Sequence, residues 1–214
     1  MKRLGMIAWA LLALTLLLVG CGPDMGREVS LGAVTAGVYR NDYLDVEFAP
    51  EGWEMHDSAD LQETIKGVSS MLRGTELEKQ LEELTQVMDF QGLAPDGSAN
   101  VNVIYTQMPA KEWAANQGLS DEEAMAEVLQ QQEAIFNAYR SVGIQPETAE
   151  ICTVTYRGEQ RTGLKIRGAV QEIPCYILQI HERTLGPCAV VVTMTAFRED
   201  TTANIAEMFK KPIM

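Results

Sequence analysis

Residues 150–197 read EICTVTYRGEQRTGLKIRGAVQEIPCYILQIHERTLGPCAVVVTMTAF, and this stretch decides the fold class. Its apolar residues alternate with polar ones or stand in short runs, which is the pattern of β-strands. Turn-forming residues interrupt it at Arg157-Gly158-Glu159-Gln160 and at Thr184-Leu185-Gly186. The sequence therefore predicts four strands, at about 150–157, 162–170, 174–182 and 188–197. Because the connections are too short for crossover helices, we expect these strands to pair antiparallel in chain order.

The flanking residues predict helices that pack on this sheet. Capping-box patterns begin two of them, at Thr75-x-x-Glu78 and Ser120-x-x-Glu123. The expected elements are strands at 44–48, 86–91 and 100–107, helices at 58–73, 75–84 and 120–143, and a short helix that Asp200 or Thr201 caps and Pro212 ends. Three valines in a row at 190–192 predict that part of the sheet is covered on both faces. We therefore expect one α+β domain, a single antiparallel sheet with amphipathic helices packed on it.

The N-terminus has the build of a signal peptide. Lys2 and Arg3 precede an apolar run from Met6 to Val19. As a helix this run would extend roughly 20 Å, less than the ~30 Å hydrocarbon core of a bilayer. The residues Leu18-Val19-Gly20-Cys21 resemble the bacterial lipobox, in which the Cys is acylated on sulfur and the chain is cut before it. An ordinary signal peptide with a chance Cys, or an uncleaved helix, are the alternatives.

These features divide the chain into three parts. Residues 1–20 are expected to be a lipoprotein signal peptide, and residues 21–36 the lipidated Cys21 with a flexible tether rich in Gly and small residues. Residues 37–214 are expected to form the folded domain. The predicted location is extracytoplasmic, on the outer face of the cell membrane, because two or three acyl chains anchor a protein durably.

The charge of the chain argues against nucleic acid as a partner. Removal of residues 1–20 takes away Lys2 and Arg3 but no acid, so 17 Lys and Arg become 15 against 30 Asp and Glu. The mature chain would then carry a net charge of −15, whereas phosphate binding needs a basic surface. Attachment to a membrane is left to the acyl chains on Cys21.

The start of the domain resembles a known family. Three consecutive segments look like the opening of PsbP-like domains. They are Val38-Tyr39, Tyr43-Leu44-Asp45-Val46-Glu47-Phe48 and Pro50-Glu51-Gly52-Trp53. The resemblance extends over about residues 36–210 and includes the Mog family, DcrB-type lipoproteins and lipoproteins of Gram-positive anaerobes whose function is not known. It implies an α/β/α sandwich, and its members serve as binding or assembly modules for unrelated partners. It supplies no functional residue for this chain.

The sequence offers little for catalysis. The motifs of serine hydrolases, phosphate loops, zinc proteases and dithiol redox proteins are absent, and the histidines number two, His56 and His181. His181 is expected to be a partly exposed strand residue beside a hairpin turn. His56-Asp57 with Asp60 reads either as a loose metal site or as a helix N-cap with acids in the first turn, and the cap is favoured. We therefore expect no enzyme activity, no cofactor and no metal.

The three cysteines after Cys21 are expected to be free, largely buried thiols. A turn around Leu185-Gly186 would place Cys188 opposite Glu182 and Cys175 opposite Thr195. Cys152 would lie two strands from Cys175, roughly 9.6 Å away, beyond the ~7 Å limit for a disulfide. Reduced thiols in an exported protein are typical of an anaerobic or weakly oxidising environment.

Two tryptophans are the candidates for an interaction surface. Trp53 follows a turn and is favoured as a core residue under the first helix. Trp113 lies in the connection from Met108 to Leu119, which reads either as a binding edge or as an extra helical turn. The preferred function is a non-catalytic interaction or assembly module with an unknown envelope protein as partner. A solute-binding lipoprotein of a transporter and, less favoured, an envelope hydrolase remain as alternatives.

Overall fold

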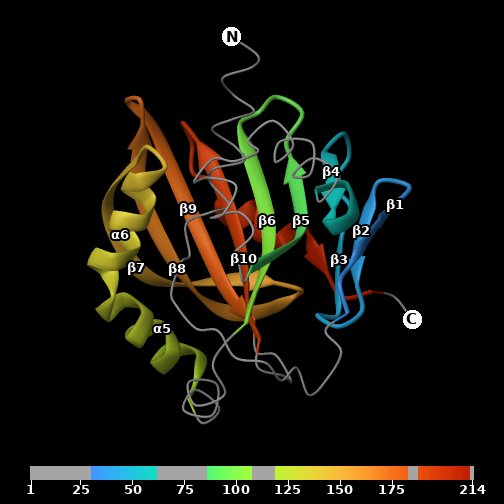
Figure 1. Ribbon diagram of the computed structural model, residues 1–214, viewed down its shortest axis with the longest axis horizontal. Helices are drawn as coiled ribbons and strands as arrows, with labels where there is room; N and C mark the ends of the chain where they lie inside the picture. Colours follow the sequence, from blue (N-terminus) through green and yellow to red (C-terminus); the bar gives the residue numbers. More distant parts are fainter. Residues whose placement is uncertain (1–29, 62–85, 108–118, 183–187, 213–214) are drawn as a thin grey trace, which may run out of the picture.

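The computed structural model describes residues 30–61, 86–107, 119–182 and 188–212, and these form two antiparallel sheets with three helices (Figure 1). The strands are β1 (Ala33–Thr35), β2 (Val38–Asn41), β3 (Val46–Phe48), β4 (Glu54–Asp57), β5 (Gln86–Leu93), β6 (Ala99–Gln107), β7 (Ile144–Tyr156), β8 (Glu159–Val170), β9 (Ile173–Glu182), β10 (Cys188–Phe197) and β11 (Phe209–Lys210). The helices are α5 (Asp121–Gln130), α6 (Gln132–Ser141) and α7 (Thr202–Met208). Among these residues, no helix is both long enough and apolar enough to cross a membrane.

The large sheet has the strand order β4-β5-β6-β10-β9-β8-β7, with every neighbouring pair antiparallel. The predicted order β7-β8-β9-β10 is confirmed. The register predicted for the last hairpin is wrong, because Cys175 lies opposite Phe197, and Glu182 lies opposite Val190. A hairpin turn sets the register of its strands, and side-chain alternation in the sequence does not report the turn length.

The small sheet has the order β1-β2-β3-β11 and corrects the expectation of a single sheet. β11 follows α7 and pairs with β3, so that Phe209 lies opposite Phe48 and Lys210 opposite Glu47. Strands of two to four residues give too short an alternation to be recognised. β1 lies within residues 21–36, so the folded part begins before residue 37, at a point where the sequence predicts a tether.

The helices agree with the sequence in where they begin, but not in continuity or in where the last one ends. α7 ends at Met208 and Phe209 belongs to β11, so the prediction that Pro212 ends this helix is wrong, because the chain turns there to pair with β3. The side chain of Ser120 accepts a hydrogen bond from Glu123 N, and the Glu123 side chain accepts from Ser120 N, which confirms the predicted capping box. The predicted single helix over 120–143 is two helices that meet at Gln131. A helical turn starts at Ser58, and the rest of the helices expected at 58–73 and 75–84 lies outside the described residues.

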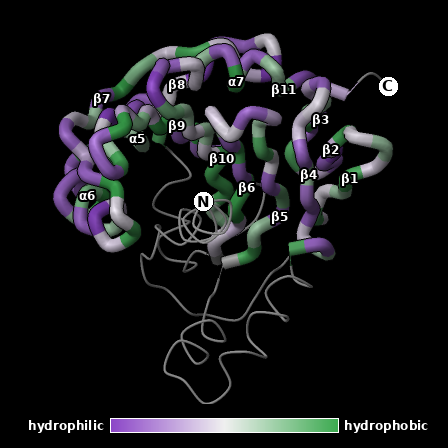
Figure 2. Tube along the Cα trace, turned by 90° about the horizontal axis from the view of Figure 1, so that it is seen from above, coloured by the Kyte–Doolittle hydropathy of each residue, from purple (hydrophilic) through white to green (hydrophobic). Residues whose placement is uncertain are grey.

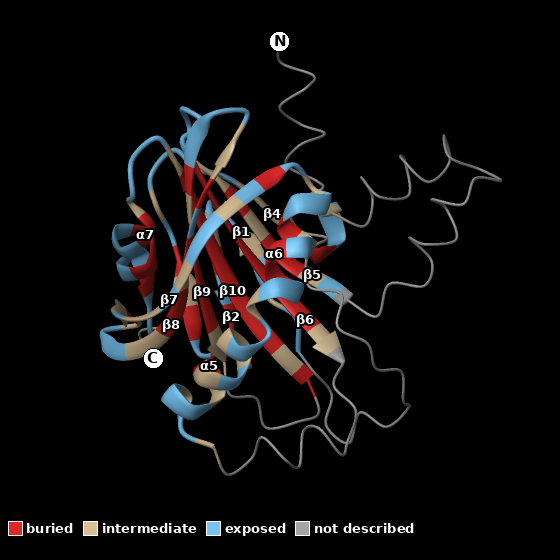
Figure 3. Cartoon of the chain, turned by 90° about the vertical axis from the view of Figure 1, so that its left-hand side faces the viewer, coloured by how far each residue is buried: buried red, intermediate tan, exposed pale blue. Residues whose placement is uncertain are grey.

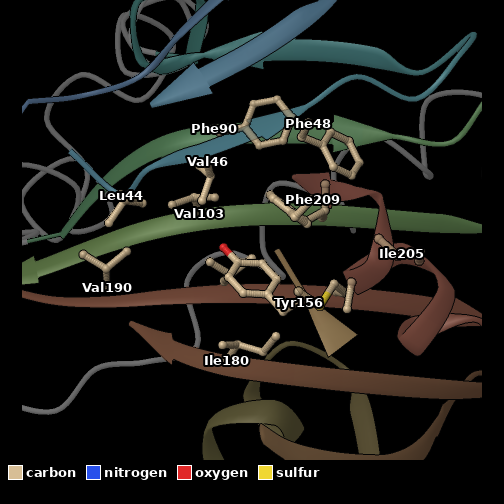
Figure 4. Packing of buried hydrophobic residues seen from close by; sticks show 14 of the residues in the cluster. Leu44, Val46, Phe48, Phe90, Val103, Tyr156, Ile180, Val190, Ile205 and Phe209 are labelled. Atoms are coloured by element: carbon tan, nitrogen blue, oxygen red, sulfur yellow. The ribbon is translucent and has the colours of Figure 1, made fainter. Parts of the chain in front are cut away.

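Two hydrophobic cores cover the two faces of the large sheet. The first lies between the large sheet, the small sheet and α7, where Phe48, Phe90, Tyr156, Ile205 and Phe209 pack together (Figure 4). The second lies under α5 and α6. Viewed from above, α5 and α6 lie at the β7 side of the curved large sheet and the small sheet at its β4 side (Figure 2). Val190, Val191 and Val192 are all buried, as predicted for a strand covered on both faces.

Candidate functional site

Of the three residues singled out in the sequence as site residues, the structure describes Trp53. Cys21 and Trp113 lie outside the described residues. Trp53 is partly buried and packs edge-on against Phe48, with ring centroids 5.4 Å apart and an interplanar angle of 84°. This contact attaches Trp53 to the first core.

The favoured N-cap interpretation of His56-Asp57 is confirmed. Asp57 Oδ1 accepts hydrogen bonds from Ala59 N at 3.0 Å and from Asp60 N at 3.3 Å, at the start of the helical turn. Its other oxygen accepts from Val34 N at 3.1 Å. His56 Nε2 lies 3.0 Å from Glu54 Oε1. In the described part of the chain, no three His, Cys, Asp or Glu side chains converge as metal ligands do.

The three cysteines of the described residues carry thiols rather than disulfides, as predicted. Cys175 pairs with Gly168 of β8, and Cys152 pairs with Gly163 on the other side of the same strand. β8 therefore separates them, as the predicted strand order requires. Burial raises the pKa of Cys175 to about 12, so its thiol is inert at neutral pH.

An open recess lies where the N-terminus of α5 faces β8 and β9. It has a volume of about 810 Å³, and its lining includes Arg157 and Arg161. Five carboxylates also line it, those of Asp121, Glu122, Glu123, Glu159 and Glu182. The residues of α5 that face solvent here and the buried strands behind them are seen in Figure 3. The recess is therefore rich in charge, with carboxylates in excess.

The floor of the recess is a charge cluster of Arg157, Glu182 and Arg161. Glu182 Oε2 lies 3.3 Å from Arg157 Nη2 and 3.2 Å from Arg161 Nη1. The Glu182 side chain is 4% exposed and each arginine side chain 13%. A carboxylate this buried needs opposite charge and hydrogen bonds to compensate for the lost hydration. The two guanidinium groups supply the charge and donate hydrogen bonds to Oε2.

Contacts from four segments hold the two arginines in place. Arg157 Nη1 donates to the carbonyl oxygen of Leu44, which precedes β3. Arg161 Nη2 donates to the His181 carbonyl at 3.2 Å, and Arg161 Nε lies 3.3 Å from Asp121 Oδ2 on α5. The guanidinium carbon of Arg157 also lies 5.2 Å from the centroid of the Tyr156 ring. The cluster therefore joins the small sheet, the large sheet and α5.

The backbone of Arg157 contributes to this placement. Arg157 has φ 55°, and Gly158 has φ 75°, so both occupy the left-handed region of the tight turn between β7 and β8. An arginine in this conformation is strained, and such strain persists where the surrounding contacts fix it. The sequence marks Arg157 as a turn residue and gives no sign of its partners, which lie 25 and 113 residues away.

The electrostatics of the recess differ between floor and rim. Burial, and then the charge of Glu182, hold the pKa of Tyr156 well above its ordinary value. At the rim, the hydrogen bond from Lys211 lowers the pKa of Glu159, and the Ser120 backbone N–H lowers that of Glu123. The rim is thus anionic at neutral pH, and Glu122 is exposed on it. This arrangement suits contact with cationic groups.

Similar chains occur among the solved structures. One of them is the solution structure of cyanobacterial PsbP (CyanoP) from Synechocystis sp. PCC 6803, at 16% sequence identity and a TM-score of 0.43. The match covers 91% of this chain and 99% of that chain. No protein-family model matches the chain, and no curated protein matches it. A similarity at this level transfers no function.

Proposed function

We propose that this chain is an extracytoplasmic binding module without catalytic activity, anchored to the outer face of the membrane by lipid on Cys21. In this proposal an envelope protein partner docks at the recess between α5 and β8–β9. The basic n-region, the apolar run and the lipobox of residues 18–21 support the anchor. The recess supports the docking site, since it is a preformed surface on long strands.

The observation that carries the proposal is that the charges on the floor of the recess are paired within the protein, whereas the rim carries an exposed carboxylate. The two arginines are already paired with Glu182 and Asp121 inside the protein, so their positive charge is compensated there. The rim carries the remaining negative charge, with Glu122 exposed to solvent. Charge of this kind steers a partner of opposite sign and fixes its orientation. The partner surface is therefore expected to be basic.

Crosslinking of the tagged full chain in the cell that makes it tests the docking site. Glu122→Lys reverses one charge on the rim and should abolish recovery of the crosslinked partner. Glu127→Lys makes the same change on an exposed position of α5 that does not line the recess, and it should leave recovery unchanged. Equal recovery with both variants would place the interface elsewhere. Trp113→Ala, assayed in the same way, tests the second candidate contact.

The anchor is tested separately. Radiolabelled palmitate should be incorporated into the full chain, and the Cys21→Ala variant should contain no label and leave the membrane fraction. Label that persists in the variant would show that the lipid is attached elsewhere. A transporter permease as the crosslinked partner would favour the alternative of a solute-binding lipoprotein.

A further inference from the structure

The first residues that the structure describes, 30–35, connect the two sheets and are here termed the strap. β1 forms the second half of the strap and is the end strand of the small sheet, where it pairs with β2 (Figure 1). Four of the six residues are exposed, whereas Gly32 and Val34 are half-buried. A short edge strand with few buried contacts opens at a lower free energy than the rest of a fold.

Two carboxylates of the large sheet hold the strap. Gly32 N donates a hydrogen bond to Asp89 Oδ1 at 2.7 Å, and Val34 N donates to Asp57 Oδ2 at 3.1 Å. The backbone at Gly32 also lies against the Tyr39 ring, since a Cβ there would come within 2.4 Å of Cε2. The closed strap therefore lies against Asp89, which is fully buried.

The Asp89 carboxylate is buried among neutral donors. It accepts hydrogen bonds from Gly32 N, from the Tyr39 hydroxyl at 2.6 Å and from Asn41 Nδ2 at 2.7 Å. None of these three donors carries a positive charge. Burial of an ionised carboxylate without a cation is unfavourable, even where hydrogen bonds offset part of the cost.

The ionisable groups that face Asp89 within the described residues add no positive charge either. β4 contributes Asp57, whose carboxylate repels a second negative charge, and β2 and β6 contribute Tyr39 and Tyr105. Burial raises the pKa of both tyrosines, so their hydroxyls stay protonated at neutral pH. Burial likewise raises the pKa of Asp89 above its ordinary value of 3.8, although the three donors oppose the shift.

Closure of the strap is therefore linked to a proton. When the strap is closed, Asp89 is out of contact with water and its neutral form is favoured, whereas an open strap lets water hydrate the carboxylate. The closed state thus binds the proton more tightly than the open state. Closure becomes more stable as the pH falls through the raised pKa, and less stable as the pH rises.

We propose that the strap and Asp89 form a proton-linked latch, which stays closed in mild acid and opens more often at neutral pH. An open latch frees residues 30–35 and lengthens the connection between the fold and Cys21 by up to about 20 Å, at ~3.3 Å per residue. The pH outside the membrane then sets how far the domain reaches from its anchor. This consequence rests on the proposed lipid anchor, whereas the latch itself does not.

Hydrogen exchange of the full chain in detergent, resolved to single residues between pH 4.5 and pH 7.5, tests the latch. Protection factors, which correct for the intrinsic pH dependence of exchange, should fall for the Gly32 and Val34 amides as the pH rises. The fall should exceed about threefold over this range, and linkage to one proton limits it to about tenfold per pH unit. Amides of β10 should not follow, because burial lowers the pKa of His181 and so makes the fold as a whole more stable at the higher pH. Strap protection that is constant, or that rises with pH, would overturn the proposal.

Substitution of each carboxylate identifies the group that titrates. Asp89→Asn is neutral at every pH and should abolish the fall in protection at Gly32. Asp57→Asn makes the same change at the other carboxylate that holds the strap, and the fall should persist. A fall that persists in Asp89→Asn would show that another group titrates and that the latch does not exist.

If Asp89→Asn does not fold, NMR titration of the Asp89 carboxyl carbon in wild type and in Gly32→Ala answers the same question. The added methyl group displaces the strap, so water should reach Asp89 and its pKa should be lower than in wild type. Equal pKa values in the two proteins would show that strap and proton are not coupled. Both measurements are independent of lipid and docking partner, so a failure of the proposed function would be recognised separately.

Discussion

The Tyr39 hydroxyl donates a 2.6 Å hydrogen bond to Asp89 Oδ2, and this contact joins the small sheet to the large one. Asp89 is buried at a bulge in β5, between Met88 and Phe90. It also accepts from Asn41 Nδ2 and from Gly32 N, each at 2.7 Å. Burial raises the pKa of Asp89, although these three donors oppose the shift. One carboxylate therefore holds the residues that connect the domain to the predicted anchor.

Loss of the Tyr39 hydroxyl should destabilise the fold. Tyr39→Phe keeps the ring, which stacks on Phe90 with centroids 4.0 Å apart, but leaves the buried carboxylate with one donor fewer. We expect the free energy of unfolding to fall by about 1–3 kcal/mol in urea titrations. Tyr176→Phe, at a half-buried position of β9, is the control and should change little. An equal effect of both substitutions would contradict the role of Asp89.

A methyl group at residue 32 should release the N-terminal segment. A Cβ on Gly32 would lie 2.4 Å from Tyr39 Cε2 and 2.8 Å from the Arg40 carbonyl oxygen, closer than any real contact. Gly32→Ala should therefore push β1 away from β2 and lower the free energy of unfolding by roughly 1–3 kcal/mol. Hydrogen exchange checks this locally, since the Gly32 and Val34 amides, which donate to Asp89 and Asp57, should lose protection. Unchanged protection would show that the segment adapts.

The charge cluster of the recess should contribute far more stability than an exposed ion pair. Glu182→Gln removes the shared carboxylate and leaves Arg157 and Arg161 close together and mostly buried. We expect a loss of roughly 3–5 kcal/mol in the free energy of unfolding. Glu159→Gln breaks the pair with Lys211, whose side chains are 55% and 49% exposed, and should leave stability almost unchanged. Similar effects of the two variants would mean that the cluster is well hydrated.

His181 should make the protein less stable in mild acid. Burial lowers its pKa from 6.5 to about 4, so between these values the unfolded chain binds a proton that the folded chain does not. The stability that the neutral ring contributes is complete above pH 6.5 and is lost as the pH falls toward 4. The loss in the free energy of unfolding is at most about 3 kcal/mol. It is expected to be less than this limit, because the residue as a whole is only half-buried and water reaches part of it.

Urea unfolding at pH 7 and pH 4.5 measures this effect. Wild type should lose more stability between the two pH values than His181→Gln, whose side chain cannot take up the proton. Equal losses in the two proteins would show that the ring is already protonated in the folded chain.

Long and strongly patterned elements were predictable from residues alone. The alternation along β7–β10 gave the strand order, and the Ser120 capping box gave the start of α5. The two-residue strand β11 was not predictable, because it is defined only by its partner β3. The recess was not predictable either, since Asp121, Arg157 and Glu182 share no spacing that would bring them together in sequence.

The sequence by itself determined the long strands β5 to β10, the antiparallel pairing of β7 to β10, the start of α5 and the acidity of the chain, because side-chain period, short turns and charge are local properties. It also supplies the basis for the predicted anchor at Cys21. The tertiary structure decided the division into two sheets, the hairpin register, the burial of Asp89 and the meeting of Arg157 and Arg161 at Glu182. These depend on which distant surfaces pack together, and the burial energy that selects the packing is summed over the whole chain.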